Sequence, residues 1–428
     1  MSAPATGGHV VHVGLLAQHA DAIGVTQEPM ALILNRHAAE RLPQGVGCRF
    51  ARIGILDLPH SLDFEVYDES LDQMTELVKE FSGDLGPPTA VVGMYEQVTL
   101  PAARLRDRFG VPGVDTETAL LCRDKVLMKE ALRGSGLRLP RFREVGPETP
   151  FSELEDFVAG LPGKIVLKPQ RQAGSFGIRI FNDAGAFLTH ARSSGIPGGY
   201  EIEEFIEGSV CHVDGVVRAG EIRFLSASRY IGDCFSFQHG GQPLASVTFD
   251  SQAMLARFTD FTELVLKHMG LRDSTFHLEA FLTPDDDLVF LELANRFGGA
   301  YVANHLKAVC GIDLARESVL ACTGQPSEIR MPANALDLAG PGASGWLYPA
   351  LPEKERCVVK RIQGLDTCPG SVVLSEIPDI GQELNDDITP FASSGKFVLA
   401  AGSSAAVEQD MRRLIKSYAV EVEMKRAA

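Results

Sequence analysis

The sequence predicts an α/β protein with an N-terminal open α/β domain, a larger mixed domain and a small C-terminal α+β domain. Three observations support this fold class. The chain has 428 residues, the usual length of two or three domains. Apolar, strand-like runs alternate with helical patterns over its first part. Between residues 276 and 299, two strand-like runs each carry an acidic residue, and a polar turn joins them.

The first domain is expected over residues 1–118. Residues 10–16 (VVHVGLL) form a continuous apolar run, as buried parallel strands do. Further elements are expected as strands at 52–56 and 90–94 and as helices at 70–81 and 98–109. Glu96 then follows the end of a strand, where open α/β sheets bind ligands.

The second domain is expected over residues 119–335, with a small separate lobe at 140–205. One capped helix is predicted from Thr116 to Leu132. The strands expected after this helix lie at 164–169, 178–180, 200–206 and 213–217. A turn-rich segment at 170–177 connects the first two of these strands.

The acidic hairpin is the most informative feature of the chain. Glu279 lies in the apolar run 276–281, and Glu292 lies in the run that begins at Phe290. The polar turn between them predicts a β-hairpin that places both carboxylates together. Two buried carboxylates are unfavourable unless a cation lies between them, and Mg²⁺, which prefers oxygen ligands, is the natural candidate. Mn²⁺ is an alternative. Arg296 follows and adds a positive charge.

A third domain is expected over residues 336–428. Gly340-Pro341-Gly342 is a candidate linker, and a helix is predicted at 404–417 among mixed strands. Nothing in this region resembles the Ala-Met-Lys-Met run of a biotin carrier.

Composition excludes several classes of partner. Forty basic and 56 acidic residues give a net charge of −16, and no basic run indicates nucleic acid. No apolar stretch approaches the roughly 20 residues of a membrane span, and the N-terminus lacks the features of a secretion signal. Eight scattered cysteines include no Cys-x-x-Cys pair. We therefore expect a cytoplasmic protein that binds neither nucleic acid nor membranes.

A candidate phosphate-binding turn runs from Gly174 to Gly177. Its glycines allow backbone N–H groups to approach an anion, Ser175 adds a donor, and Lys168 precedes it at a strand end. The turn matches neither the P-loop nor the dinucleotide-binding glycine motif, and an ordinary hairpin turn is the alternative. A solvated strand terminus is the alternative for Lys168.

Polar residues on two further strands remain open to two interpretations. The acidic strand 201–207 is either a solvated sheet edge or a nucleotide-binding hinge. His212 and Asp214 alternate on one strand, where a structural histidine is the default. His277 shares a strand face with Glu279 and is a candidate to orient that carboxylate.

Taken in order, these motifs resemble the ATP-grasp superfamily over nearly the whole chain. The motifs are Arg123-Asp124-Lys125, KIVLKP ending at Pro169, AGSFG at 173–177, EEFIEG at 203–208, HLE at 277–279 and ELANR at 292–296. The run at 203–217 and Ser228-Arg229-Tyr230 look most like the branch that joins carboxylates to amines, which includes amino acid (dipeptide) ligases.

The resemblance implies a site residue by residue. Around ATP, it implies phosphate contacts by Lys125 and Lys168, a flexible lid containing Gly174, Ser175 and Gly177, an adenine contact by Glu203, and backbone contacts by Glu204 and Ile206. Glu279 and Glu292 would bind Mg²⁺, and Arg296 would hold the substrate carboxylate or its acyl phosphate. The fold implied is a two-lobed ATP-binding domain between the N- and C-terminal domains.

Two positions depart from the family pattern. Ala294 stands where the family commonly has a metal-binding Asn, and Asn295 is displaced by one residue. Val210 stands where a ribose-binding glutamate is common, and His212 or Asp214 is a candidate to supply that contact.

The reaction implied is amide formation from a carboxylate and an amine through an acyl phosphate. Backbone N–H groups of Gly298 and Gly299 are candidates to stabilise the oxyanion. His239 is a candidate base for the amine, with a plain loop histidine as the alternative. Competing interpretations are a biotin-carboxylase-like or purine-biosynthetic enzyme of the same superfamily, and a non-catalytic nucleotide-binding protein. Members of the superfamily are often homodimers, and a homodimer is expected.

Overall fold

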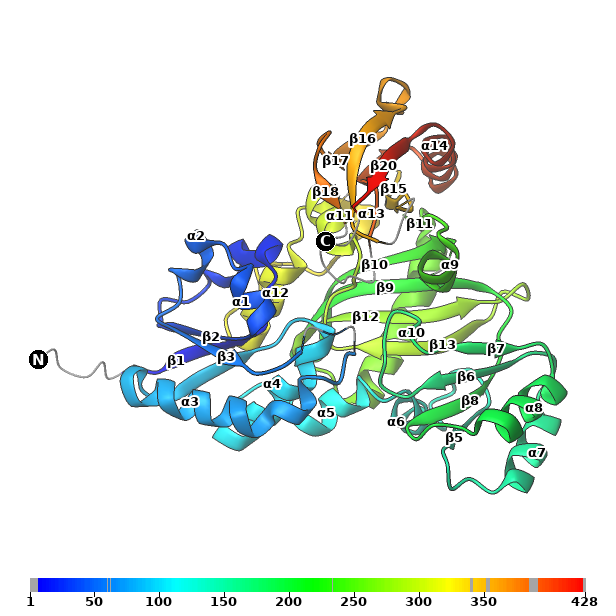
Figure 1. The fold of residues 1–428 in the computed structure, drawn as a ribbon, viewed down its shortest axis with the longest axis horizontal. Helices are drawn as coiled ribbons and strands as arrows, with labels where there is room; N and C mark the ends of the chain where they lie inside the picture. Colours follow the sequence, from blue (N-terminus) through cyan, green and yellow to red (C-terminus); the bar gives the residue numbers. More distant parts are fainter. Residues whose placement is uncertain are drawn as a thin grey trace, which may run out of the picture.

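A computed structural model describes residues 7–425, apart from residues 60, 62, 233, 339–341, 352–354 and 385–391. The strands of these described residues form four sheets. In Figure 1 the N-terminal sheet (blue) and a small four-stranded sheet (green) lie at opposite ends of the molecule. The C-terminal strands and helix (orange to red) project from the middle.

The N-terminal sheet is parallel, with the strand order β3-β2-β1-β4. Alternate residues of β1 enter two cores, because Val11 packs with α3 and α4 whereas Val10 packs with the helices that follow the acidic hairpin. The elements are β1 (His9–Val13), β2 (Met30–Asn35), α1 (Arg36–Glu40), α2 (Gln44–Gly47), β3 (Arg52–Leu56), α3 (Leu71–Leu85), β4 (Pro88–Val92) and α4 (Glu96–Phe109).

The helix predicted from Thr116 to Leu132 is two helices, which corrects the sequence prediction. Helix α5 (Thr116–Leu121) is capped by Asp115, and α6 (Lys125–Ala131) is capped by Asp124. The Asp124 carboxylate accepts from the backbone N–H groups of Val126 and Leu127. Because an N-cap residue has an extended backbone, Asp124 begins a new helix and places Lys125 in its first turn.

The small four-stranded sheet has the order β5-β8-β6-β7 and forms a lobe that we call the lid lobe. One face packs on two helices through residues such as Leu167 and Ile202. The opposite face carries Lys168, Glu201 and Glu203, because side chains alternate along a strand. Its elements are β5 (Phe142–Val145), α7 (Phe151–Ala159), β6 (Ile165–Pro169), β7 (Arg179–Phe181), α8 (Ala184–Ser194) and β8 (Tyr200–Glu204).

The largest sheet joins the middle and the C-terminal part of the chain. Its order is β13-β12-β9-β10-β11-β15-β19-β17, and β14 also pairs with β10. The strands are β9 (Ser209–Arg218), β10 (Glu221–Ile231), β11 (Leu244–Thr248), β12 (Ser274–Leu282), β13 (Leu288–Ala294), β14 (Ala333–Asn334), β15 (Ala343–Tyr348), β17 (Val372–Glu376) and β19 (Lys396–Ala401). The helices of this region are α9 (Cys234–Gly240), α10 (Gln252–Met269), α11 (Val302–Cys310), α12 (Leu314–Cys322) and α13 (Ala335–Leu338).

A further three-stranded sheet, β18-β16-β20, completes the C-terminal part. It contains β16 (Cys357–Gln363), β18 (Glu383–Leu384) and β20 (Ala419–Met424), and α14 (Ser404–Ser417) precedes its last strand. Among the described helices, none combines the length and apolarity that a bilayer crossing requires. The division into domains at residues 118 and 335 stays a prediction.

Candidate functional site

The two acidic residues of the predicted hairpin lie directly opposite each other. Strands β12 and β13 pair in antiparallel register, with Glu279 opposite Glu292. Residues that face each other in this way project to the same side of a sheet. Both carboxylates are partly buried, with 14% and 24% of their side-chain surface exposed. Two such oxygen donors match the preference of Mg²⁺ and Mn²⁺ for hard ligands, so these residues fit the expected metal.

Each carboxylate of this pair has a different set of neighbours. Glu292 Oε2 lies 3.0 Å from Nζ of Lys125. Glu279 Oε1 accepts from Tyr230 OH at 2.9 Å and lies 3.3 Å from Nε2 of His277. Burial alone raises the pKa of Glu279, but the hydrogen bonds from His277 and Tyr230 outweigh burial and lower the pKa. The site therefore holds Glu279 as a carboxylate, the form that binds a metal.

Lys168 and Glu203 belong to a buried cluster of two lysines and two glutamates, which also contains Lys129 and Glu201. Lys129 Nζ donates to Glu201 at 2.8 Å and to Glu203 at 2.7 Å, and all three side chains are buried. Lys168 Nζ lies 2.8 Å from Glu203 Oε2. Burial alone raises the pKa of Glu203, but Lys129 and Lys168 lower it to about 2. The pKa of Glu201, which has one close lysine, is raised by burial.

This cluster decides between two interpretations of the acidic strand. Strand β8 lies between β5 and β6, so it is not a solvated edge, and that alternative is wrong. Strand β8 ends at Glu204, whose Oε2 accepts from the backbone N–H of Arg141 at 3.1 Å. Ile206 follows as a buried residue. The contacts with adenine predicted for Glu203, Glu204 and Ile206 stay predictions, as does the phosphate contact of Lys168.

The glycine turn at residues 173–177, which we call the lid turn, has an unusual backbone. Gly174, Ser175 and Gly177 have φ angles of +62°, +64° and +73°. Side chains disfavour this left-handed region, and glycine tolerates it. A Cβ at Gly174 would lie 3.2 Å from Nε2 of Gln238, so the turn lies against helix α9. Helix α9 includes position 239, but the side chain of His239 lies outside the described residues, and its role as a base stays a prediction.

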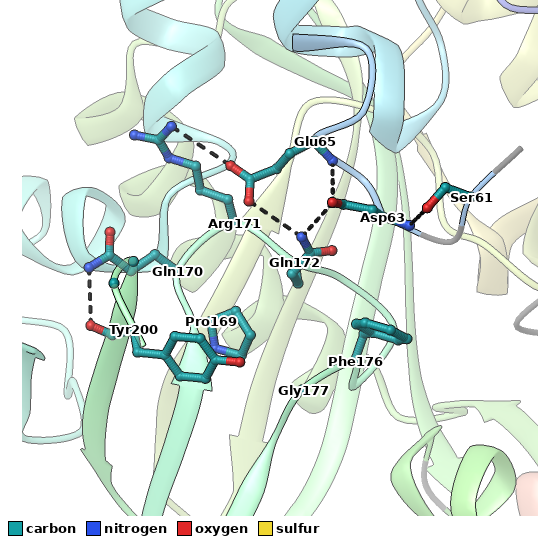
Figure 2. Close-up of a pocket in the computed structure, with 12 residues that line it drawn as sticks. Ser61, Asp63, Glu65, Pro169, Gln170, Arg171, Gln172, Phe176, Gly177 and Tyr200 are labelled. Carbon is teal, nitrogen blue, oxygen red and sulfur yellow. Dashed lines mark hydrogen bonds and ion pairs between the residues drawn. The ribbon is translucent and has the colours of Figure 1, made fainter. Parts of the chain in front are cut away.

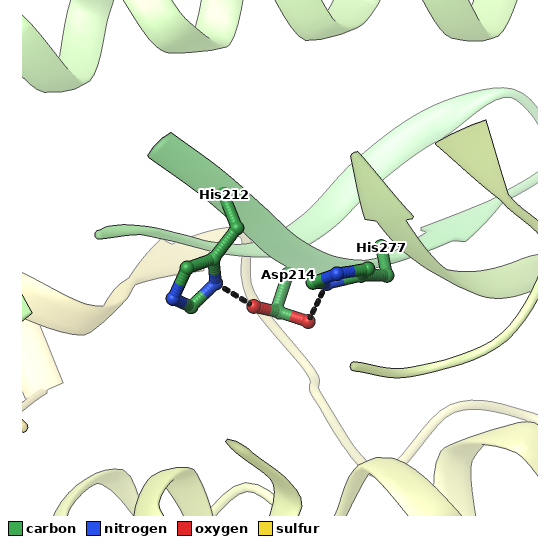
Figure 3. Close-up of side chains that lie close together, drawn as sticks. All are labelled: His212, Asp214 and His277. Atoms are coloured by element: carbon green, nitrogen blue, oxygen red, sulfur yellow. Dashed lines mark hydrogen bonds and ion pairs between the residues drawn. The ribbon is translucent and has the colours of Figure 1, made fainter. Parts of the chain in front are cut away.

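His212, Asp214 and His277 form a buried hydrogen-bond network beside Glu279 (Figure 3). Asp214 Oδ2 lies 2.6 Å from Nδ1 of His212, and Oδ1 lies 2.9 Å from Nδ1 of His277. The other nitrogen of His212 bonds Ser246 at 2.6 Å. Burial lowers the pKa of His277, but Asp214 and Glu279 raise it to about 10, so the ring donates through both nitrogens.

Two histidines and an aspartate are also a common metal-ligand set, and their donor atoms lie within 4.8 Å of one another. In this structure, however, every ring nitrogen of the two histidines has a hydrogen-bond partner. The network therefore orients Glu279, as predicted for His277. The ribose contact predicted for His212 or Asp214 stays a prediction.

The same aspartate corrects one expectation about the oxyanion. The backbone N–H of Gly298 donates to Asp214 Oδ1 at 3.0 Å and is therefore already used. A Cβ at position 298 would lie 2.4 Å from this oxygen, so only glycine permits the contact. Gly298 serves to connect the loop after β13 with the Asp214 network, and an oxyanion role for it was wrong.

Arg296 binds a carboxylate of the N-terminal sheet region. Its Nε donates to Glu96 Oε2 at 2.5 Å, and Glu96 Oε1 accepts from NH1 of Arg123 at 2.5 Å. Burial raises the pKa of Glu96, but Arg296 and Arg123 lower it to about 2. Glu292 helps to raise the pKa of Arg296, so this guanidinium lies within electrostatic reach of the carboxylate pair. Neighbouring rings of Tyr95 and Phe297 pack edge to face at 6.2 Å.

Several residues of this site were missed or left without a role. Lys129 was placed on a helix, where a lysine is usually solvated, although its position one turn after Lys125 puts both on one face. Tyr230 was part of a motif but had no assigned contact. Gln172 carries no sequence signal that we recognise.

Comparison with known proteins supports the resemblance. Residues 122–275 match the ATP-grasp domain family. An L-arginine-specific L-amino acid ligase of Bacillus subtilis is 26% identical over 256 residues, which span 58% of this chain and 59% of the relative. The match therefore covers less than two thirds of the relative's length.

Solved structures share the fold over almost the whole chain. An L-amino acid ligase from Bacillus licheniformis superposes with a TM-score of 0.70 at 15% identity, covering 98% of this chain and 99% of that one. Phosphoribosylglycinamide synthetase from Anaerococcus prevotii gives a TM-score of 0.67 at 15% identity, covering 98% and 100%. The chain therefore contains an ATP-grasp domain at residues 122–275 and has the ATP-grasp fold.

Proposed function

We propose that this chain is an ATP-dependent carboxylate–amine ligase that forms an amide bond on an amino acid or a related small carboxylate. The observation that carries the proposal is the contact of Arg296 with Glu96 near the carboxylate pair. A guanidinium binds a carboxylate bidentately, and Glu96 offers the opposite charge beside it. Such a pair is complementary to a zwitterion, whose carboxylate would take Arg296 and whose ammonium would take Glu96.

The similarity to the Bacillus subtilis amino acid ligase supports the same reaction class. The solved structures do not separate this class from purine-biosynthetic enzymes, because their TM-scores differ by little. The cytoplasmic location and the homodimer expected from the sequence remain predictions.

The reaction proceeds in two steps. First, an oxygen of the substrate carboxylate bonds to the γ-phosphorus of ATP, the bond from that phosphorus to ADP breaks, and an acyl phosphate forms. The amine nitrogen then bonds to the acyl carbon, the bond from carbon to phosphate breaks, and the nitrogen loses a proton. The first step brings two anions together, so it requires positive charge at the point of contact.

The residues of this chain have separate roles in these steps. Glu279 and Glu292 would hold a divalent cation, which supplies charge neutralisation when bound. Lys125 and Lys168 would bind phosphate oxygens, and Arg296 positions the attacking carboxylate. The lid turn excludes water, which would otherwise hydrolyse the acyl phosphate.

The test is phosphate release from ATP and Mg²⁺ across pairs of amino acids and other small carboxylates and amines, with product masses. Amine-dependent release with a new amide mass supports the ligase. Release with bicarbonate alone overturns it in favour of a carboxylase, and ATP binding without release overturns it in favour of a binding protein. Glu292→Gln should lose turnover, whereas Glu76→Gln, at a residue whose side chain is 72% exposed, should not.

A further inference from the structure

A cavity of about 690 Å³ lies between the lid lobe and the N-terminal sheet region (Figure 2). Asp63 and Glu65 line one side, and Pro169, Phe176 and Tyr200 line the other. Gln172, which directly precedes the lid turn, reaches across to the acidic side, as the dashed lines in Figure 2 show. This glutamine has no role in the reaction described above.

The side chain of Gln172 uses both ends of its amide on the segment 63–65. Nε2 donates to Asp63 Oδ1 at 2.8 Å and to Glu65 Oε2 at 3.3 Å. Oε1 accepts from the backbone N–H of Phe64 at 3.3 Å. Arg171 adds an ionic contact with Glu65 at 3.9 Å. Because an amide that donates and accepts on one segment fixes both its position and its orientation, these contacts hold the lid in one place.

The same segment holds the arginines of the substrate site. The backbone carbonyl of Phe64 accepts from NH2 of Arg123 at 2.6 Å, and this guanidinium lies 5.9 Å from the Phe64 ring. Arg123 also binds Glu96, and Glu96 binds Arg296. Both arginine side chains and Glu96 have less than 15% of their surface exposed. Hydrogen bonds therefore run without a break from Gln172 through Phe64, Arg123 and Glu96 to Arg296.

The backbone of Gln172 makes a second connection, to the metal side of the site. Its carbonyl accepts from Nζ of Lys125 at 2.6 Å, and the same Nζ lies 3.0 Å from Glu292. One residue thus contacts the phosphate-binding lysine through its backbone and the substrate-binding arginines through its side chain.

We propose that Gln172 is a positioning residue that couples docking of the lid to the placement of Arg296. The proposal rests on the proposed function for the meaning of the two sites, but the contacts themselves do not depend on it. When the lid docks on residues 63–65, Phe64 fixes Arg123, and Glu96 then holds Arg296. The lid consequently docks most firmly when the substrate arginine is in place, so the phosphates are covered only when the substrate site is formed.

The test measures backbone hydrogen exchange by mass spectrometry in the full chain without substrates. In Gln172→Ala, exchange should rise roughly fivefold to tenfold in the segments 63–66 and 170–178, as the loss of one or two hydrogen bonds predicts. It should also rise in the segment 296–300, which Gln172 does not touch. Gln172→Glu should have a larger effect, because a third carboxylate then faces Asp63 and Glu65.

The reverse direction supplies the stronger evidence. Glu96→Gln should raise exchange in the segment 170–178 by at least about twofold, although Glu96 has no recorded contact with that segment. Gln18→Ala, at an exposed glutamine of the N-terminal region, should leave all these segments unchanged.

Two results overturn the proposal. Lid exchange in Gln172→Ala that equals that of Gln18→Ala would show that Gln172 does not hold the lid. Because coupling between two sites is reciprocal, a change in only one direction, or in neither, would show that the lid and Arg296 are independent. A chain that fails to form amides but shows both exchange effects would overturn the proposed function and leave the coupling intact.

Discussion

Arg296 and Glu96 lie 200 residues apart in the chain, yet Nε of the arginine donates to Oε2 of the glutamate at 2.5 Å. Arg123 binds the other carboxylate oxygen, so one glutamate is shared by two arginines. Three charged groups that are each mostly buried must remain together, because an unpaired charge there would be strongly destabilising. The N-terminal sheet region is therefore part of the site, although its sequence contains no binding motif.

Arg296→Lys should weaken carboxylate binding. Lysine keeps the charge but loses the planar fork that binds two oxygens. We expect the KM of the carboxylate substrate to rise about tenfold or more, with a smaller change for ATP. Steady-state kinetics with each substrate varied in turn measure both, and Arg192→Lys, on the exposed surface, is the control. Equal increases in both KM values would contradict a specific role in substrate binding.

Gly298→Ala should disturb the metal side of the site. The new Cβ would lie 2.4 Å from Asp214 Oδ1 and 2.9 Å from Nδ1 of His277. His277 then loses its fixed position beside Glu279, and we expect metal affinity to fall by roughly 10- to 100-fold. Titration with Mn²⁺ measures the affinity. Gly83→Ala meets nothing within 4 Å and serves as control, and unchanged Mn²⁺ affinity in Gly298→Ala would show that the network does not support Glu279.

Lys129→Met should destabilise the fold. The variant leaves Glu201 and Glu203 buried with Lys168 as their nearest cation. We expect a loss of about 3–5 kcal/mol in the free energy of unfolding, measured by urea denaturation. Adding Glu201→Gln should recover part of the loss, since it removes the uncompensated charge. Lys79→Met, at a side chain 59% exposed, should change stability by less than about 0.5 kcal/mol.

His12 should make stability depend on pH. It is fully buried, neither ring nitrogen has a hydrogen-bond partner in the described part of the chain, and burial lowers its pKa to about 4. The unfolded chain, with a pKa of about 6.5, binds a proton that the folded state refuses, so stability falls as the pH drops from 6.5 towards 4. The size of this effect is roughly 3 kcal/mol.

Replacing His12 with Leu should remove that dependence. Urea denaturation at pH 8 and at pH 4.5 should show a smaller loss of stability on acidification for His12→Leu than for the wild type. The exposed His268, replaced in the same way, should leave the loss unchanged. A wild-type loss retained in His12→Leu would assign the acid sensitivity to other groups.

Local patterns carried most of the fold. The hairpin of β12 and β13 follows from two apolar runs around a polar turn, and its register brings Glu279 opposite Glu292. The predicted helix at 404–417 has the bounds of α14. Strand β2 was missed although Met30–Asn35 is an apolar run, and Asp124 was not recognised as a cap inside a helical pattern.

Contacts between distant residues could not be predicted in the same way. The Asp214 network and the arginine pair on Glu96 depend on which strands become neighbours, and no local period encodes that. The resemblance named Lys125, Glu292 and Arg296, but not Lys129, Gln172 or Glu96 as their partners. Lysine and glutamine on a helix or in a turn are solvated in most proteins, so their burial here becomes visible only once the chain is folded.

The pairing of β15 with β11 has a consequence for dissection of the chain. Strand β11 is buried along its whole length, and β15 covers its outer edge. A truncation before residue 343 would leave the backbone of β11 unpaired, and exposed edges of this kind recruit strands from other molecules. The C-terminal part is thus no detachable module, and shortened versions of this protein should aggregate rather than report on the nucleotide site alone.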